Sequence, residues 1–301
     1  MIENIFTYAF LLQTLRISVP YFLPSLGAAY SEKGGVVNIG LEGILLTGAF
    51  FTTLGTYYTQ NIWIGILCGL TAGFLIALIH GIATITFKAD QIVSGIALNL
   101  FALGLTKFLC RIIFNSSSNS ARIPGLETVN IPLLSSIPIL NNIFITFCII
   151  LLILSQIIFY RSKFGLRLRA VGENPAAADS LGINVLRIRY AGVLISGLLA
   201  GLGGAWLAFD QHSFTDGMSA GRGFIALAAM IVGKWKPMGA AAACLVFGFA
   251  ESISIQFQGT AIPTQFIQML PYILTIIILA GFIGKSTPPA ADGIPYENTN
   301  K

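Results

Sequence analysis

The sequence predicts an all-α, polytopic transmembrane helical bundle, and three observations carry that prediction. Of the 301 residues, 55% are hydrophobic and only 10% are charged, and the mean hydropathy is +0.82. Ordinary soluble domains carry about 25% charged residues, so a soluble protein of this composition could not cover its core with polar surface. Apolar runs of about 20 residues, the length that crosses a bilayer, recur along the chain, and basic residues stand between them.

About nine spans are expected from these runs. Their approximate ranges are 5–29, 40–58, 62–87, 91–113, 141–160, 188–209, 220–234, 237–257 and 265–284. The first is interpreted as a retained span, because neither a basic stretch nor a small-residue cleavage site marks it as a signal peptide. The organisation is therefore a transmembrane domain over residues 1–284 and a flexible cytoplasmic tail over 285–301.

The orientation follows from the basic segment 161–189, which holds six of the seventeen Lys and Arg residues. Basic residues in short loops face the cytoplasm, so this segment is expected inside. Counting outward then places Lys88, Lys234 and Lys285 inside. The loop 114–140 and the N-terminus fall outside.

Two glycine-rich segments, 31–43 and 217–239, interrupt the apolar pattern at comparable positions in the two halves of the chain. Non-helical backbone at membrane depth survives only where protein or water covers it. Paired interruptions of this kind point to the binding region of a transporter and to an internal repeat. The repeat is weak in this sequence. Each segment is expected to be a broken or re-entrant helix, with a cytoplasmic loop as the alternative for 31–43.

Polar residues within the apolar runs are candidates for a solute path, because they are costly in a membrane. The candidates for the path are Asn38, Glu42, Asn99, Arg222 and Glu251. Amides and hydroxyls with few charges suit an uncharged polar solute better than an ion. Interhelical hydrogen bonds or helix caps would explain the same residues, and Glu42 could cap free amides beside a helix start.

Several other functions are excluded by the sequence. The four cysteines form no CxxC pair and the two histidines lie far apart, so neither a metal site nor a disulfide framework is expected. Residues 279–286 end like a P-loop, but Leu279 stands where that motif requires Gly and an apolar run precedes it. No nucleophile and base pattern marks an enzyme, no cofactor is implied, and the basic residues between apolar runs do not indicate nucleic acid.

Small residues recur four apart at Gly69 and Gly73 and along residues 192–205. Such spacing lets helix backbones approach closely in lipid. It fits packing within one subunit, which we favour, or the seam of a dimer.

The cytoplasmic segment contains a short helix that could dock onto a partner. Asn174 can cap it, Pro175 fits its first turn, and Gly182 can end it. Three alanines, Ala176, Ala177 and Ala178, form its surface. An amphipathic loop at the membrane surface, with its arginines near lipid phosphates, would also explain the segment.

Four blocks of the sequence resemble one family. NPAAADSLGIN, residues 174–184, resembles the coupling loop of the membrane subunits of ABC importers for branched-chain amino acids, ribose and nucleosides. Pro175 departs from the pattern, which has Glu at that position. SEKGGVVNIGLEGILLTGAF, GRGFIALAAMIVGKWKPMGA and KSTPPAADGIPY are similar to motifs of the simple-sugar and nucleoside branch of that family.

The resemblance implies a permease subunit in a bacterial inner membrane. A cytoplasmic ABC ATPase would bind the coupling loop, and a second permease subunit, identical or paralogous, would complete the membrane part. An extracytoplasmic binding protein or lipoprotein would deliver the solute. A nucleoside is expected, with ribose or a branched-chain amino acid as alternatives. A secondary carrier for a polar uncharged solute, driven by an ion gradient, is the alternative of another class.

Overall fold

The computed structural model describes residues 7–126, 142–258, 287–297 and a few positions between 266 and 277. Over this part of the chain the structure is helical and has no strand beyond one isolated bridge between Asn119 and Thr215. The helices are α1 (Tyr8–Lys33), α2 (Leu41–Thr59), α3 (Ile62–Gly81), the π-helix η2 (Ile82–Thr86), α4 (Gln91–Phe114), α5 (Ile143–Arg161), α6 (Lys163–Glu173), α7 (Pro175–Ser180), α8 (Val185–Gln211), α9 (Arg222–Val232) and α10 (Pro237–Phe257). The all-α prediction is confirmed.

Helix α8 lies at the centre of the bundle, where it packs against α1, α2 and α3. Of its most apolar stretch 83% is buried, against 22% for α4 and for α5. The last two helices expose rows of large apolar side chains, among them Leu100 and Phe108 on α4 and Ile153 on α5. Exposed apolar surface of this extent fits lipid or a second membrane subunit.

The small residues of α8 pack within this chain. A Cβ at Gly201 would lie 2.6 Å from the carbonyl oxygen of Gly69 on α3, and one at Gly48 on α2 would lie 2.7 Å from the carbonyl oxygen of Gly201. Backbones in such close contact leave no room for a side chain. This agrees with the preferred interpretation of the spacing.

Five of the described helices are long and apolar enough to cross a membrane, namely α3 with η2, α4, α5, α8 and α10. The expected count of nine spans is not confirmed, and the span expected over 265–284 lies outside the continuously described residues. Helix α9 has 11 residues, which corresponds to about 16 Å and is about half of a bilayer core. It is too short to cross by itself.

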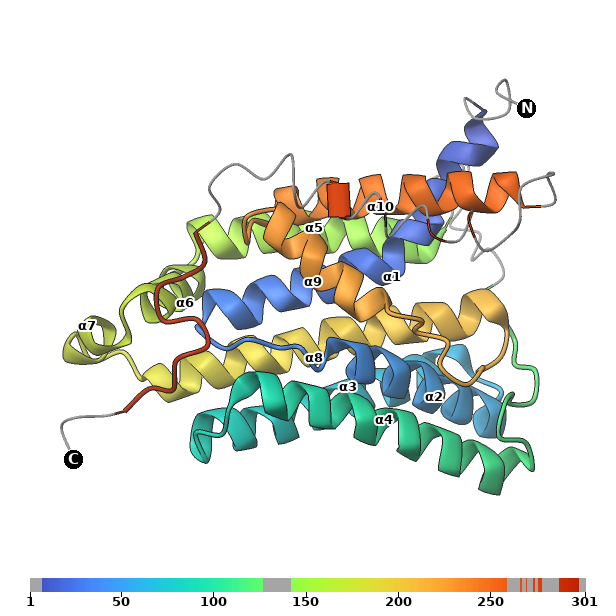
Figure 1. Cartoon of the computed structure of the whole chain (residues 1–301), viewed down its shortest axis with the longest axis horizontal. Helices are drawn as coiled ribbons and strands as arrows, with labels where there is room; N and C mark the ends of the chain where they lie inside the picture. Colours follow the sequence, from blue (N-terminus) through green and yellow to red (C-terminus); the bar gives the residue numbers. More distant parts are fainter. Residues whose placement is uncertain are drawn as a thin grey trace.

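The two ends of the bundle carry different parts of the chain. Helices α6 and α7 and residues 287–297 lie together at one end (Figure 1). The first turns of α1 and the loop after α8 lie at the opposite end. The segment expected in the cytoplasm and the N-terminal end of α1, expected outside, are therefore separated by the length of the bundle.

Candidate functional site

The first glycine-rich segment is a break between two helices. Helix α1 ends at Lys33, residues 34–40 are not helical, and α2 begins at Leu41. Polar side chains satisfy much of the backbone that this break leaves unpaired, as buried polar groups require. Gln91 Oε1 accepts from the Val37 amide at 2.6 Å, and His80 Nε2 lies 2.9 Å from the Val37 carbonyl oxygen. The break is thereby held in one conformation.

Asn99 on α4 fixes the far end of the same break. Its Oδ1 accepts from the Gly43 amide at 2.8 Å, and its Nδ2 donates to the Ile39 carbonyl oxygen at 3.0 Å. Asn99 therefore joins the last residues of the break to the first turn of α2. Its partly exposed side chain also faces a cavity.

Glu42, in the first turn of α2, binds the start of the other broken segment. Its two carboxylate oxygens accept from the amides of Gly221 and Gly223, each at 2.7 Å. These amides open α9, and a carboxylate at a helix N-terminus satisfies free donors and complements the helix dipole. The two glycine-rich segments predicted from the sequence thus meet at Glu42.

Arg222 and Glu251 form a largely buried ion pair beside this contact. Arg222 Nη2 lies 2.9 Å from Glu251 Oε1, and about a fifth of each side chain is exposed. Tyr21 on α1 donates from its hydroxyl to the other oxygen of Glu251. The pair joins the first turn of α9 to α10 and, through Tyr21, to α1.

A cavity of about 390 Å³ opens at the meeting of the two broken segments. Glu42 and Asn99 line it together with Ser219 and the exposed ring of Phe224. Its remaining walls are the apolar side chains and glycine backbone of α2, α4 and the loop before α9. A concave site with an aromatic face and a few polar groups suits a small organic solute.

The five predicted path residues are therefore not all in one place. Glu42 and Asn99 line the cavity, whereas Arg222 and Glu251 pair with each other close to it. Asn38 is fully buried and donates from Nδ2 to Ser196 Oγ of α8 at 3.1 Å. It is not among the residues that line the cavity.

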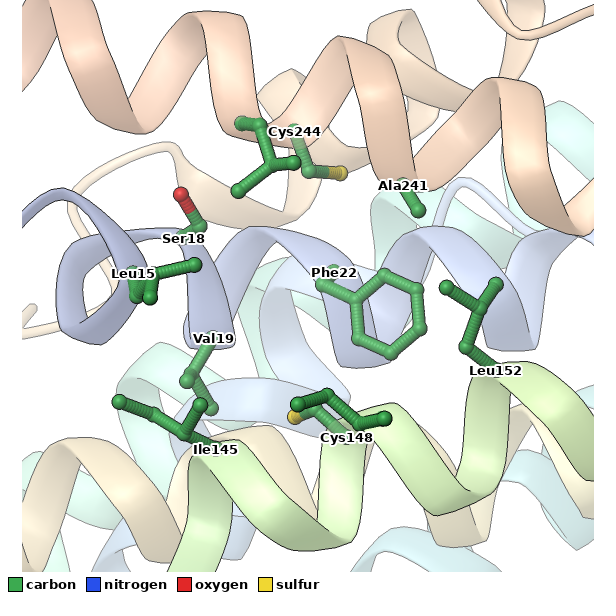
Figure 2. Close-up of a pocket in the computed structure, with 11 residues that line it drawn as sticks. Leu15, Ser18, Val19, Phe22, Ile145, Cys148, Leu152, Ala241 and Cys244 are labelled. Carbon is green, nitrogen blue, oxygen red and sulfur yellow. The ribbon is translucent and has the colours of Figure 1, made fainter. Parts of the chain in front are cut away.

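A second, smaller cavity of about 120 Å³ lies between α1, α5 and α10 (Figure 2). Apart from Ser18, its labelled walls are apolar side chains and the two cysteines Cys148 and Cys244. The cavity offers almost no hydrogen-bonding surface for a polar solute. Within the described part of the chain there is also no group of His, Cys, Asp and Glu that could hold a metal ion.

The predicted docking helix is α7, and it forms as the sequence indicates. Asn174 Oδ1 accepts from the Ala177 amide at 3.0 Å, Pro175 is the first helical residue, and Gly182 follows with φ +77°. Only Ala178 is buried, against Val171 and Val185. The exposed face carries the remaining small residues, Ala176, Ala177 and Ser180, and is followed by Leu181, which is 80% exposed.

Residues 287–297 lie along α6 and α8, beside α7, although the sequence predicts a flexible tail (Figure 1). The Ala291 amide donates to the Gly172 carbonyl oxygen at 2.9 Å, and Arg189 Nη1 donates to the Ile294 carbonyl oxygen at 2.9 Å. Arg189 is fully buried. Part of the expected tail is therefore attached to the end of the bundle that carries α7.

Several contributors to these contacts were not among the predicted site residues, His80, Tyr21 and Arg189 among them. A Tyr hydroxyl or a His ring within an apolar run requires a partner, and that rule could have selected the first two. No pattern in the sequence indicates that residues 287–297 pack on Arg189.

Comparison of the sequence with known proteins finds one matching family and several similar permeases. The family described as the permease component of the branched-chain amino acid transport system matches residues 10–279. The guanosine ABC transporter permease protein NupQ of Bacillus subtilis is 44% identical, with 94% of each chain covered. The nucleoside ABC transporter permease protein NupC of Lactococcus lactis is also 44% identical, again with 94% of each chain covered.

A solved structure resembles the fold. It is an inward-facing ABC transporter described as of the metal-chelate type, with a TM-score of 0.52 and 16% identity, covering 90% of this chain and 84% of that one. At this identity the likeness concerns the fold alone.

Proposed function

The chain belongs to the branched-chain amino acid transport permease family of ABC importers, and we propose that it is the permease subunit of an ATP-driven nucleoside importer. The observation that carries this proposal is the 44% identity to NupQ and NupC over nearly the full length of all three chains. The chain is a multi-pass membrane protein and is not itself an enzyme. A bacterial inner membrane is its proposed location.

The solute path is proposed to run through the cavity at the two broken segments. Half-helix ends and unwound backbone at membrane depth are the usual means by which transporters contact a solute. Glu42 is occupied by two amides, and both polar atoms of Asn99 already bond to backbone groups. The hydrogen-bonding capacity left for a solute is therefore the second proton and lone pair of the Asn99 amide and the hydroxyl of Ser219, beside the ring of Phe224. An uncharged solute with an aromatic base and hydroxyl groups matches this set. Arg222 and Glu251 are proposed to position α9, and Asn38 to hold the break against α8.

Coupling is proposed to occur at α7. A cytoplasmic ABC ATPase would bind the exposed side of Ala176 and Ala177, and Ala178 would transmit the motion to α6 and α8 through its buried contacts. A second permease, the same or paralogous, would pair with this one in the membrane. An extracytoplasmic binding protein or lipoprotein would supply the nucleoside.

Uptake by proteoliposomes that contain the complete transporter tests the proposal. Labelled nucleoside should enter only with ATP, and unlabelled nucleosides should compete whereas ribose and leucine should not. Competition by ribose or leucine instead would show that the same ATP-driven transporter carries another substrate. Uptake that needs no ATP and collapses with an ionophore would contradict the ATP-driven mechanism and favour a secondary carrier.

A further inference from the structure

The C-terminal segment, which we define as residues 287–297, packs on one side against the elements that carry the proposed docking helix. The Ala291 amide donates to the Gly172 carbonyl oxygen at the end of α6 at 2.9 Å. Tyr296 packs on the buried cluster that holds Ala178 of α7 in place. The segment is drawn in dark red beside α6 and the start of α8 in Figure 1. Movement of α6 or α7 would therefore meet this segment directly.

The other side of the C-terminal segment lies against the break at residues 34–40. A Cβ on Gly35, where φ is +83°, would lie 3.1 Å from the Ala291 carbonyl oxygen. A Cβ on Gly293 would lie 3.6 Å from Val37 Cγ2. Side chains of α3 and α4 fix the amide and carbonyl groups of that same valine. The segment is thus in contact with the break at two positions, and direct contact extends through it from α6 to the break.

Arg189, near the start of α8, joins the segment to the break with one guanidinium group. The residue is 2% exposed, and its Nη1 donates to the Ile294 carbonyl oxygen at 2.9 Å. This is its only hydrogen bond to the protein groups that the structure describes, and a buried charge requires such a bond. Its Nη2 faces the break, because a Cβ on Gly35 would lie 3.0 Å from that atom. The guanidinium is planar and rigid, so a shift of the segment also alters the contact with Gly35.

We propose that Arg189 is a positioning residue for transport and that it holds the C-terminal segment as a link between α7 and the 34–40 break. When α7 and α6 move, Gly172 and the cluster around α7 displace the segment, and the segment carries that displacement to Gly35. The break is in turn attached through Asn99 to the wall of the candidate solute cavity. The role in transport rests on the proposed function, whereas the attachment of the segment does not.

Hydrogen exchange of the full-length permease in liposomes tests the attachment without ATP or solute. Arg189→Met keeps a long side chain but removes its donors. The Ala291 amide should therefore lose at least about tenfold in protection, the contribution of one hydrogen bond from a charged donor. The Val37 amide in the break should lose protection with it. Arg189→Lys keeps a donor and should retain most of the protection of both amides.

Arg187→Met is the matched control, because Arg187 lies two residues earlier on the same helix and is exposed. It should leave both amides at their parent values. Amides of α2 show in the same experiment whether each variant is folded. If Arg189→Met does not fold, a chain that ends at residue 286 replaces it, and a chain that ends at residue 297 is its control because it keeps the whole segment. Parent protection of the Val37 amide in folded Arg189→Met, or in the chain that ends at residue 286, would overturn the attachment.

Uptake and ATP hydrolysis in the complete transporter test the role of the link. In proteoliposomes with Arg189→Met, nucleoside uptake should fall about tenfold, while ATP hydrolysis stays near the parent rate because α7 is unchanged. A purely structural defect would lower both rates together, and Arg189→Lys should recover the parent ratio of uptake to hydrolysis. An unchanged ratio in Arg189→Met would overturn the link and favour transmission through the direct contact of Gly172 with Lys33 at the end of α1.

Failure of this inference and failure of the proposed function give different results. A parent transporter that carries no nucleoside would contradict the proposed function, and the exchange measurements would still report on the segment. A parent transporter that couples uptake to hydrolysis, together with an unchanged ratio in Arg189→Met, would contradict the link alone.

Discussion

The Glu42 carboxylate binds the Gly223 amide at 2.7 Å, and the Gly223 Cα packs so closely on α2 that a Cβ would lie 2.5 Å from the Glu42 nitrogen. The starts of α2 and α9 are thus joined by both a hydrogen bond and direct backbone contact. Because the residues are 181 positions apart, this contact closes the protein around the candidate solute cavity. Movement of either helix start must be transmitted to the other.

Substitution of Gly223 by Ala should therefore abolish close contact at the cavity. The added methyl group meets backbone atoms, which cannot rotate away, and overpacking of this kind costs about 1–3 kcal/mol. We expect a lower melting temperature and impaired uptake. Thermal unfolding of the purified permease in detergent measures the first effect.

Gly104→Ala is the matched control for that substitution. Gly104 is also in a helix, but nothing lies within 4 Å of a Cβ placed there. This variant should be neutral or more stable by up to about 1 kcal/mol, because Ala favours helix. Equal melting temperatures for the two variants would show that α2 and α9 are not in the contact described.

Removal of one member of the Arg222–Glu251 pair should destabilise the protein by about 3 kcal/mol, because the remaining charge is left largely buried without its partner. Glu251→Gln and Arg222→Gln should each lower the melting temperature. The double variant should lose less stability than the sum of the losses in the two single variants. Asp210→Asn is the control, since Asp210 pairs with Arg16 at an exposed site and should contribute at most about 1 kcal/mol. Additive losses at Arg222 and Glu251 would contradict a direct pair.

The sequence predicts the helical class, both glycine-rich breaks and the capped form of α7, because each depends on local composition or on turn residues. Asn174, Pro175 and Gly182 act through the backbone of their own helix, so their roles follow from their order. The partners of Glu42 could not be predicted in this way. Which amides a carboxylate caps depends on how two distant helix starts meet, and neither periodicity nor hydropathy records that pairing.

The same limit applies to the pair of Arg222 and Glu251 and to the C-terminal residues 287–297. The polarity of both residues within apolar runs marks them as candidates, but a shared path and a structural ion pair have the same pattern in the sequence. This C-terminal segment is polar and rich in proline, which predicts flexibility. Its attachment depends instead on a few contacts with other helices, such as the hydrogen bond from Arg189 to the Ile294 carbonyl oxygen.

Replacement of Ala177 by Arg should uncouple ATP hydrolysis from transport. Ala177 is exposed on α7, so the substitution should leave the melting temperature of the isolated permease unchanged while it blocks a close-fitting partner. We expect ATP-dependent uptake to fall at least about tenfold in the complete transporter, as for loss of a central interface contact. Gln60→Arg adds the same charge at the exposed C-terminal cap of α2 and should leave uptake intact. Normal coupling in Ala177→Arg would disprove docking at α7.

Substitution of Gly201 by Ala separates packing within the subunit from a role in dimer formation. The new Cβ would lie 2.6 Å from the Gly69 carbonyl oxygen of the same chain, so α8 and α3 must move apart. We expect a loss of stability of about 1–3 kcal/mol that is the same at every protein concentration, because the contact is intramolecular. Thermal unfolding over a range of concentrations, with native mass spectrometry of the oligomer, measures both quantities. Unchanged stability with a loss of dimers would place the seam of small residues between subunits instead.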